Sequence, residues 1–85
     1  MPVIRRFLGI VIMMYYRDHN PPHFQPKYGD YEIIVSIEGK VLEGKFPKRA
    51  LQLVIEWLNL HKKELLDNWQ KTQNGEPLKS IAPLE

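Results

Sequence analysis

The stretch H-F-Q-P-K-Y-G-D-Y-E-I-I-V-S at residues 23–36 decides the fold. Two runs rich in β-branched and aromatic residues flank Gly29-Asp30, a dipeptide typical of a two-residue hairpin turn. With that turn, the opposite charges of Lys27 and Glu32 face each other across the two strands. The alternation also gives the hairpin one apolar face, as a sheet that covers a core on one side requires.

A further strand is expected after a second two-residue turn at Gly39-Lys40, which would pair Ile33 with Phe46. Pro26 cannot donate to ladders on both sides, so we expect its strand at a sheet edge or a bulge. The predicted core-facing residues are Phe24, Tyr28, Tyr31, Ile33, Val35, Ile37, Leu42 and Phe46. The predicted opposite face carries His23, Gln25, Lys27, Glu32, Ser36, Glu43 and Lys45.

Strands are also expected before this hairpin, and a helix after it. Residues 3–7 and 10–16 are rich in β-branched and aromatic residues and are separated by Leu8-Gly9, a candidate hairpin turn. Residues 47–74 place apolar side chains at three- and four-residue steps, which indicates a helix. We therefore predict an α+β fold, in which an antiparallel sheet of about four to five strands over residues 3–46 packs on the helical segment.

The helical segment has two apolar stripes in its first half. Either it breaks near Asn59 into a helix pair, or another segment covers its back. Gly75, followed by Pro77, predicts the end of the helix. An extended tail follows, whose apolar residues could cover the helix or contact a partner; these residues are Leu78, Ile81 and Leu84.

Length and composition limit the function classes. A chain of 85 residues forms one domain, 1–85, with one modest core. The absence of cysteine excludes disulfides and thiolate zinc sites. The apolar run at residues 10–16 is far shorter than the roughly 20 residues that span a bilayer, and no signal peptide is expected. We expect a cytoplasmic protein without a membrane partner.

The loop D-H-N-P-P-H at residues 18–23 holds two histidines beside two prolines. Histidine exchanges a proton near neutral pH, so His19 and His23 are candidates for general acid and base catalysis on a phosphodiester. Asp18 could orient an imidazole, and Asn20 lies between the histidines. Alternatively, both histidines bond to backbone groups at the strand ends. A metal held by the histidines and Asp18 is a third reading, but the spacing matches no strong signature, so no metal or cofactor is expected.

The net charge of +2 is concentrated in two stretches, because residues 1–29 and 40–49 each carry +3. Lys48 and Arg49 lie at the predicted helix start, where free N–H groups also favour an anion. The alternative is a solvated basic edge that pairs with Glu43. The candidate phosphate contacts are Arg17, Lys27, Lys45, Lys48 and Arg49.

The side of the sheet away from the helix is predicted to carry apolar residues. Such a patch on a single-layer sheet is typical of a homodimer or of a surface for a partner protein. Alternatively, the sheet curls over and buries it. The candidate interface residues are Val11, Met13, Tyr15 and Ile34, together with Leu78, Ile81 and Leu84 of the tail.

Several motifs together resemble the small bacterial DUF4160 family, a domain of unknown function. They are G-I-V-I-M-M-Y at 9–15, D-H-N-P-P-H-F at 18–24, Y-G-D-Y-E at 28–32, L-E-G-K-F-P-K-R-A-L at 42–51, W-L-N-L-H-K-K-E-L-L-D-N-W at 57–69 and G-E-P-L-K-S-I-A-P-L at 75–84. The family loop usually reads H-N-P-P-H-F-H, so Gln25 stands where its third histidine would be, which weakens a metal site most. The resemblance implies a gene beside that of another small protein, in arrangements like toxin–antitoxin modules.

Two hypotheses of different classes follow. In the first, the chain is a toxin-like component that acts on RNA as a metal-independent RNase, with His19 and His23 as acid and base. In the second, it is a non-catalytic protein-binding module, antitoxin-like or regulatory, that uses the outer sheet face and the tail. The expected partners are a small protein encoded by a neighbouring gene or a second copy of the chain, and RNA under the first hypothesis.

Overall fold

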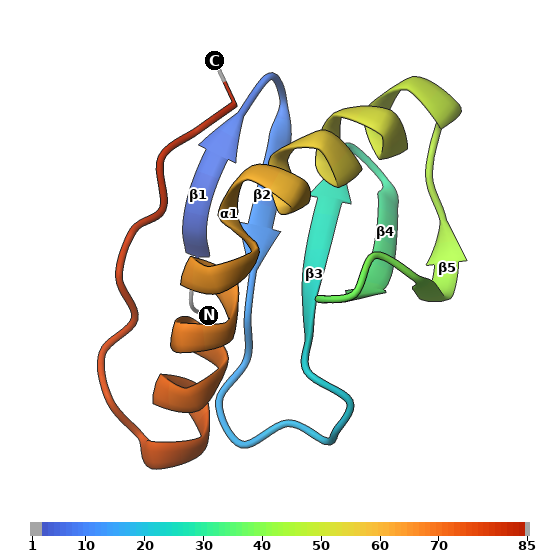
Figure 1. Cartoon of the computed structure of the whole chain (residues 1–85). Coiled ribbons are helices and arrows are strands. Elements are labelled where there is room, and N and C mark those ends of the chain that lie inside the picture. The colour runs from blue at the N-terminus through green and yellow to red at the C-terminus, as the bar shows by residue number, and fades with distance from the viewer. Residues whose placement is uncertain (1–2, 85) are drawn as a thin grey trace.

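The computed structural model describes residues 3–84 and shows an antiparallel sheet followed by one long helix (Figure 1). Five strands lie side by side in sequence order, so the sheet is a meander. The helix α1 covers one face of the sheet. The predicted α+β fold is confirmed. The elements are β1 (Val3–Phe7), β2 (Ile10–Met13), β3 (His23–Tyr28), β4 (Tyr31–Ser36), β5 (Val41–Lys45) and α1 (Lys48–Asn74).

The hairpin of β3 and β4 has the predicted register, with Lys27 opposite Glu32 and Phe24 opposite Val35. The prediction for Pro26 was wrong, because β3 is the central strand and Pro26 is buried opposite Ile12 of β2. The pairing of β3 with β4 is interrupted around this proline, which has no N–H to donate. The strand therefore tolerates the hydrogen bond that Pro26 cannot donate, because the proline ring is buried.

The turn before β5 is longer than predicted. The N–H of Ser36 donates to the carbonyl of Lys40 at 2.8 Å, and the N–H of Lys40 donates to the hydroxyl of Ser36 at 3.0 Å. With this longer turn Val35 pairs with Val41, and a register shift between Ile34 and Val35 then places Ile33 opposite Gly44 and not Phe46. The turn and this irregularity together set the register of the last strand.

This change of register corrects the predicted core face. Leu42 is 42% exposed, and Tyr28 and Tyr31 at the tip of the hairpin are 37% and 51% exposed. In the opposite sense, His23 and Ser36, which were expected on the outer face, are buried. Residues of the hairpin tip and of β5 are exposed, whereas His23 and Ser36 at the other end of β3 and β4 are buried.

The helix α1 is kinked at His61, whose backbone has non-helical φ and ψ of −127° and 23°. The predicted break near Asn59 lies two residues away. The tail covers part of the second apolar stripe, since the Trp57 indole N–H donates to the carbonyl of Ala82 in the tail at 2.8 Å, whereas Leu60 is 65% exposed. The helix is therefore broken, and its back is covered in part. The buried core comprises Ile4, Phe7, Ile10, Ile12, Met14, Phe24, Ile33, Val35, Ile37, Ala50, Val54, Trp57, Leu58, Leu65, Trp69 and Ile81.

The tail after Gly75 runs back along α1 to β1 (Figure 1). Asn68, which is 1% exposed, donates to the carbonyl of Lys79 at 2.9 Å and accepts from its N–H at 3.0 Å. The N–H of Ile81 donates to the carbonyl of Ile4 at 3.3 Å. The tail is thereby fixed beside the edge strand β1. In residues 3–84, no helix combines the length and the apolar character needed to cross a bilayer.

Candidate functional site

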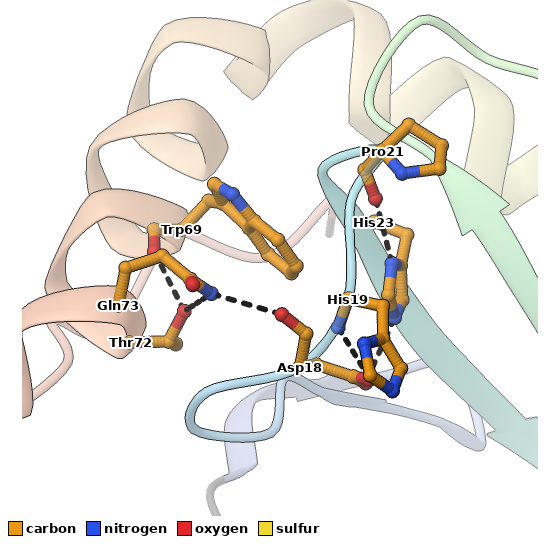
Figure 2. Close-up of polar contacts among 7 residues, drawn as sticks. All are labelled: Asp18, His19, Pro21, His23, Trp69, Thr72 and Gln73. Atoms are coloured by element: carbon orange, nitrogen blue, oxygen red, sulfur yellow. Dashed lines mark hydrogen bonds and ion pairs between the residues drawn. The ribbon is translucent and has the colours of Figure 1, made fainter.

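The loop between β2 and β3 is organised around the carboxylate of Asp18 (Figure 2). Its Oδ1 accepts the N–H of His19 at 2.8 Å, and its Oδ2 lies 2.9 Å from Nε2 of His23. The other ring nitrogen of His23, Nδ1, lies 2.8 Å from the carbonyl oxygen of Pro21, which follows a cis peptide bond. Both nitrogens of His23 are therefore held by the loop itself.

The ionisation of Asp18 explains the orientation of this ring. Partial burial acts to raise the pKa of Asp18, but hydrogen bonds from the His19 N–H and the His23 ring, with the charges of both histidines, hold it below its ordinary value of 3.8. A carboxylate and a carbonyl can only accept hydrogen bonds. Both ring nitrogens of His23 thus face hydrogen-bond acceptors.

His23 is buried as well as bonded. It is 7% exposed, and its ring centroid lies 5.1 Å from that of Trp69 on α1. General acid or base catalysis needs a ring nitrogen that reaches the substrate, and His23 has both nitrogens occupied. His19 and Asn20 are exposed, and His19 contributes its backbone N–H to Asp18. The structure therefore brings together Asp18 and His23 and leaves the side chain of His19 exposed.

The same loop is attached to the last turns of α1. The N–H of Arg17 donates to the carbonyl of Thr72 at 3.2 Å, and the side chain of Gln73 donates to the carbonyl of Asp18 at 3.4 Å (Figure 2). Thr72 is buried and donates its hydroxyl to the carbonyl of Trp69. These contacts, together with the His23 ring against Trp69, attach the loop to the C-terminal half of α1.

The candidate phosphate contacts are distributed over three places. Arg17 lies at the C-terminal end of α1, near Gly75, whereas Lys48 and Arg49 lie in its first turn. Opposite ends of a helix of 27 residues cannot bind one phosphate. Lys27 and Lys45 lie on the sheet, each opposite Glu32. The two lysines on the sheet share a surface.

That surface is the outer face, by which we mean the side of the sheet opposite α1. The strand registers align one residue from each strand in a line, which we call the basic row: Arg6, Val11, Lys27, Glu32 and Lys45. The next line, two residues away along four of the five strands, we call the apolar row: Val3, Met13, Gln25, Ile34 and Glu43. A hollow of about 310 Å³ lies over both rows near β1 and β2.

The four apolar residues predicted for this face are all on it. Val11, Met13 and Tyr15 line the hollow, and Ile34 lies farther along the apolar row. Met13 is only 3% exposed, and the Tyr15 hydroxyl lies 3.8 Å from its sulfur. The tail residues differ, because Ile81 is 1% exposed in the core, and Leu78 and Leu84 pack partly against it. While the tail is docked, Ile81 cannot contact a partner.

Sequence reasoning did not single out Arg6 or Asn68 as important residues. Arg6 joins the basic row because it lies opposite Val11, a relation that needed the register of β1 and β2. Asn68 is a polar residue inside a helix. The indication of its burial in the sequence is its position directly before Trp69, on a buried face of the helix. In residues 3–84, no group of three or more His, Asp or Glu side chains could hold a metal ion.

Comparison with known proteins gives one finding. The model of the family described as Domain of unknown function (DUF4160) matches residues 9–70, well over half of the chain. No curated protein and no solved structure matches it. The matched range contains the Asp18 loop, four of the five strands and most of α1. The chain therefore belongs to the DUF4160 family.

Proposed function

We propose that this chain is a non-catalytic protein-binding module, one component of a two-protein pair of the toxin–antitoxin type, and that its partner binds the outer face. One observation carries the proposal. Within residues 3–84 no helix covers the outer face, where Val11, Met13 and Tyr15 line the hollow and Ile34 lies farther along the apolar row. Apolar residues concentrated on an uncovered sheet face favour association, because a partner removes them from water.

The state of the histidine loop supports binding over catalysis. An RNase mechanism with paired histidines needs two imidazoles that exchange protons with substrate. Here the carboxylate of Asp18 and the carbonyl of Pro21 occupy both nitrogens of His23, and Trp69 lies against the ring. Catalysis through His23 would require the loop to open and expose that ring.

The experiment is co-expression with the protein encoded by the neighbouring gene, followed by co-purification. The test variant carries Val11→Glu and Ile34→Glu, two half-buried positions on the outer face. Met13 is avoided, because a charge at a side chain 3% exposed would destabilise the fold itself. Leu60→Glu is the matched control, since Leu60 is 65% exposed on α1, away from the outer face.

We expect the double variant to lose the partner, and Leu60→Glu to retain it, with unchanged circular dichroism in both. Equal recovery of the partner with the double variant and the wild type would contradict the proposal. The RNase alternative has its own test, in which purified wild-type protein and His19→Ala are incubated with RNA. Cleavage of RNA by the wild type, and its loss in His19→Ala, would show that the protein is an enzyme that needs the exposed His19 ring.

A further inference from the structure

The basic row carries three cations at regular spacing. Arg6, Lys27 and Lys45 lie on β1, β3 and β5, on alternate strands of one line. Strands are about 4.8 Å apart, so successive cations in the row lie about 9.6 Å apart. Within residues 3–84, none of the three comes within 4.0 Å of a carboxylate oxygen, although Glu32 stands between the two lysines. Their charges are therefore available to a partner.

The apolar row runs beside this line. Two residues along a strand correspond to about 6.7 Å, so Met13 and Ile34 lie about one side chain away from the basic row. Val11 and the hollow join the two rows near β1 and β2. A ligand that fits must present an apolar stripe and, beside it, negative charges.

We infer that the outer face binds an acidic amphipathic helix of the partner protein, with its apolar stripe on Val11 and Ile34 and its carboxylates on Arg6, Lys27 and Lys45. This inference rests on the proposed function, which it deepens by naming the chemistry of the partner. A helix is the element that commonly covers a sheet face, as α1 does on the opposite side. Residues seven apart in a helix lie about 10.5 Å apart, close to the spacing of the cations.

The composition of the two rows favours a protein over RNA. Single-stranded nucleic acid binds on aromatic rings that stack on its bases, and neither row contains an aromatic residue. Tyr15 lines the hollow, but its hydroxyl is directed to the sulfur of Met13. Glu32 and Glu43 would also lie against a continuous polyphosphate, whereas a helix can place neutral residues opposite them.

The test uses the full chain, labelled with ¹⁵N, and three defined probes. The first is a designed helical peptide of about 21 residues, with leucine on one face and glutamate beside it, which spans about 31 Å. The second is the same peptide with lysine in place of glutamate. The third is an oligouridylate of about 12 nucleotides, a length within the range that single-strand-binding folds cover. Amide shifts in β1 to β5 identify the binding face, and affinities are compared at low and high salt.

We expect the acidic peptide to shift resonances of both rows and to bind more weakly as salt rises. The double variant Arg6→Glu, Lys27→Glu should weaken binding of the acidic peptide roughly tenfold, because each exposed ion pair contributes up to about fivefold in affinity. Lys63→Glu, the same change on the exposed side of α1, should leave affinity unchanged. Any of three results would overturn the inference. The lysine peptide binds as tightly as the acidic peptide, only the oligouridylate binds, or the double variant binds the acidic peptide as tightly as the wild type does.

The two proposals fail in different ways. If Val11→Glu with Ile34→Glu separates the natural pair but Arg6→Glu with Lys27→Glu does not, the outer face is the interface and the partner is not acidic. If neither double variant separates the pair, both proposals are wrong.

Discussion

Replacing Gly44 with alanine tests the close approach of β5 to β4. Gly44 has φ of 87°, in the left-handed region, and a Cβ there would overlap the carbonyl oxygen of Glu32 and lie 3.1 Å from Cα of Ile33. The left-handed conformation costs a residue with a side chain about 1–2 kcal/mol. Overlap with a neighbouring backbone adds about 1–3 kcal/mol, because no rotamer relieves it. We therefore expect Gly44→Ala to lower the free energy of unfolding by about 2–5 kcal/mol.

Gly29→Ala is the matched control. Gly29 also has positive φ, 59°, but nothing lies within 4 Å of the Cβ position, so only the conformational cost of about 1–2 kcal/mol applies. Urea unfolding is followed by the fluorescence of Trp57 and Trp69, both buried. The loss for Gly44→Ala should exceed that for Gly29→Ala by about 1–3 kcal/mol. Equal losses would refute the reasoning, since the contact with β4 would then contribute nothing.

Three further predictions concern the tail and the loop. Asn68→Ala should cost about 1–3 kcal/mol and speed hydrogen exchange at the Lys79 amide, because both hydrogen bonds to that backbone are lost; unchanged exchange would contradict this. Ile81→Ala should cost about 2–5 kcal/mol in urea unfolding, whereas Leu60→Ala should change stability by less than about 0.5 kcal/mol; similar losses would show that the tail is not docked. The pKa of Asp18 is lowered in the folded protein, so its carboxylate stabilises the fold above about pH 3.8, and this contribution disappears as the pH falls through the lowered pKa. The stability difference between wild type and Asp18→Ala should therefore shrink in acid, and a difference that persists unchanged to a pH of about 2 would exclude this role.

The docked tail has a consequence for the two edges of the sheet. Bonds from Ile81 to Ile4, and from the Arg5 side chain to Ser80, place the tail beside β1. The residues of β5 are all exposed, and this edge carries the bulge at Ile34/Val35 and the left-handed Gly44. Irregularities of this kind discourage the pairing of an edge strand with another chain. Partner binding at the outer face, and not at an edge, is consistent with that arrangement.

Local patterns predicted the parts of the fold that depend on local interactions. The Gly29-Asp30 turn and the alternation around it specify the register of β3 and β4, because a short turn leaves the flanking residues one way to pair. The helical period over residues 48–74 likewise predicts α1 from its own sequence. The four apolar residues of the outer face follow from the same alternation. These features need no knowledge of distant contacts.

The register of β5 and the position of Pro26 were not predictable in this way. The first depends in part on a hydroxyl of Ser36 that closes a longer turn, and the second on burial of the proline ring opposite Ile12 in a neighbouring strand. In each case the free energy gained from one contact exceeds the local conformational preference of the sequence. Alternation and turn residues alone describe neither contact.

By itself, the sequence determined one cysteine-free α+β domain whose chemistry-bearing residues include a histidine loop and scattered cations. Only the tertiary structure decided how those residues are arranged in space. The path of the loop places Asp18 on His23 and leaves His19 exposed, and the alignment of strands brings Arg6, Lys27 and Lys45 into one row. The physical reason is that ion pairing, burial and surface charge depend on distances between residues far apart in the chain, which packing sets and local pattern does not.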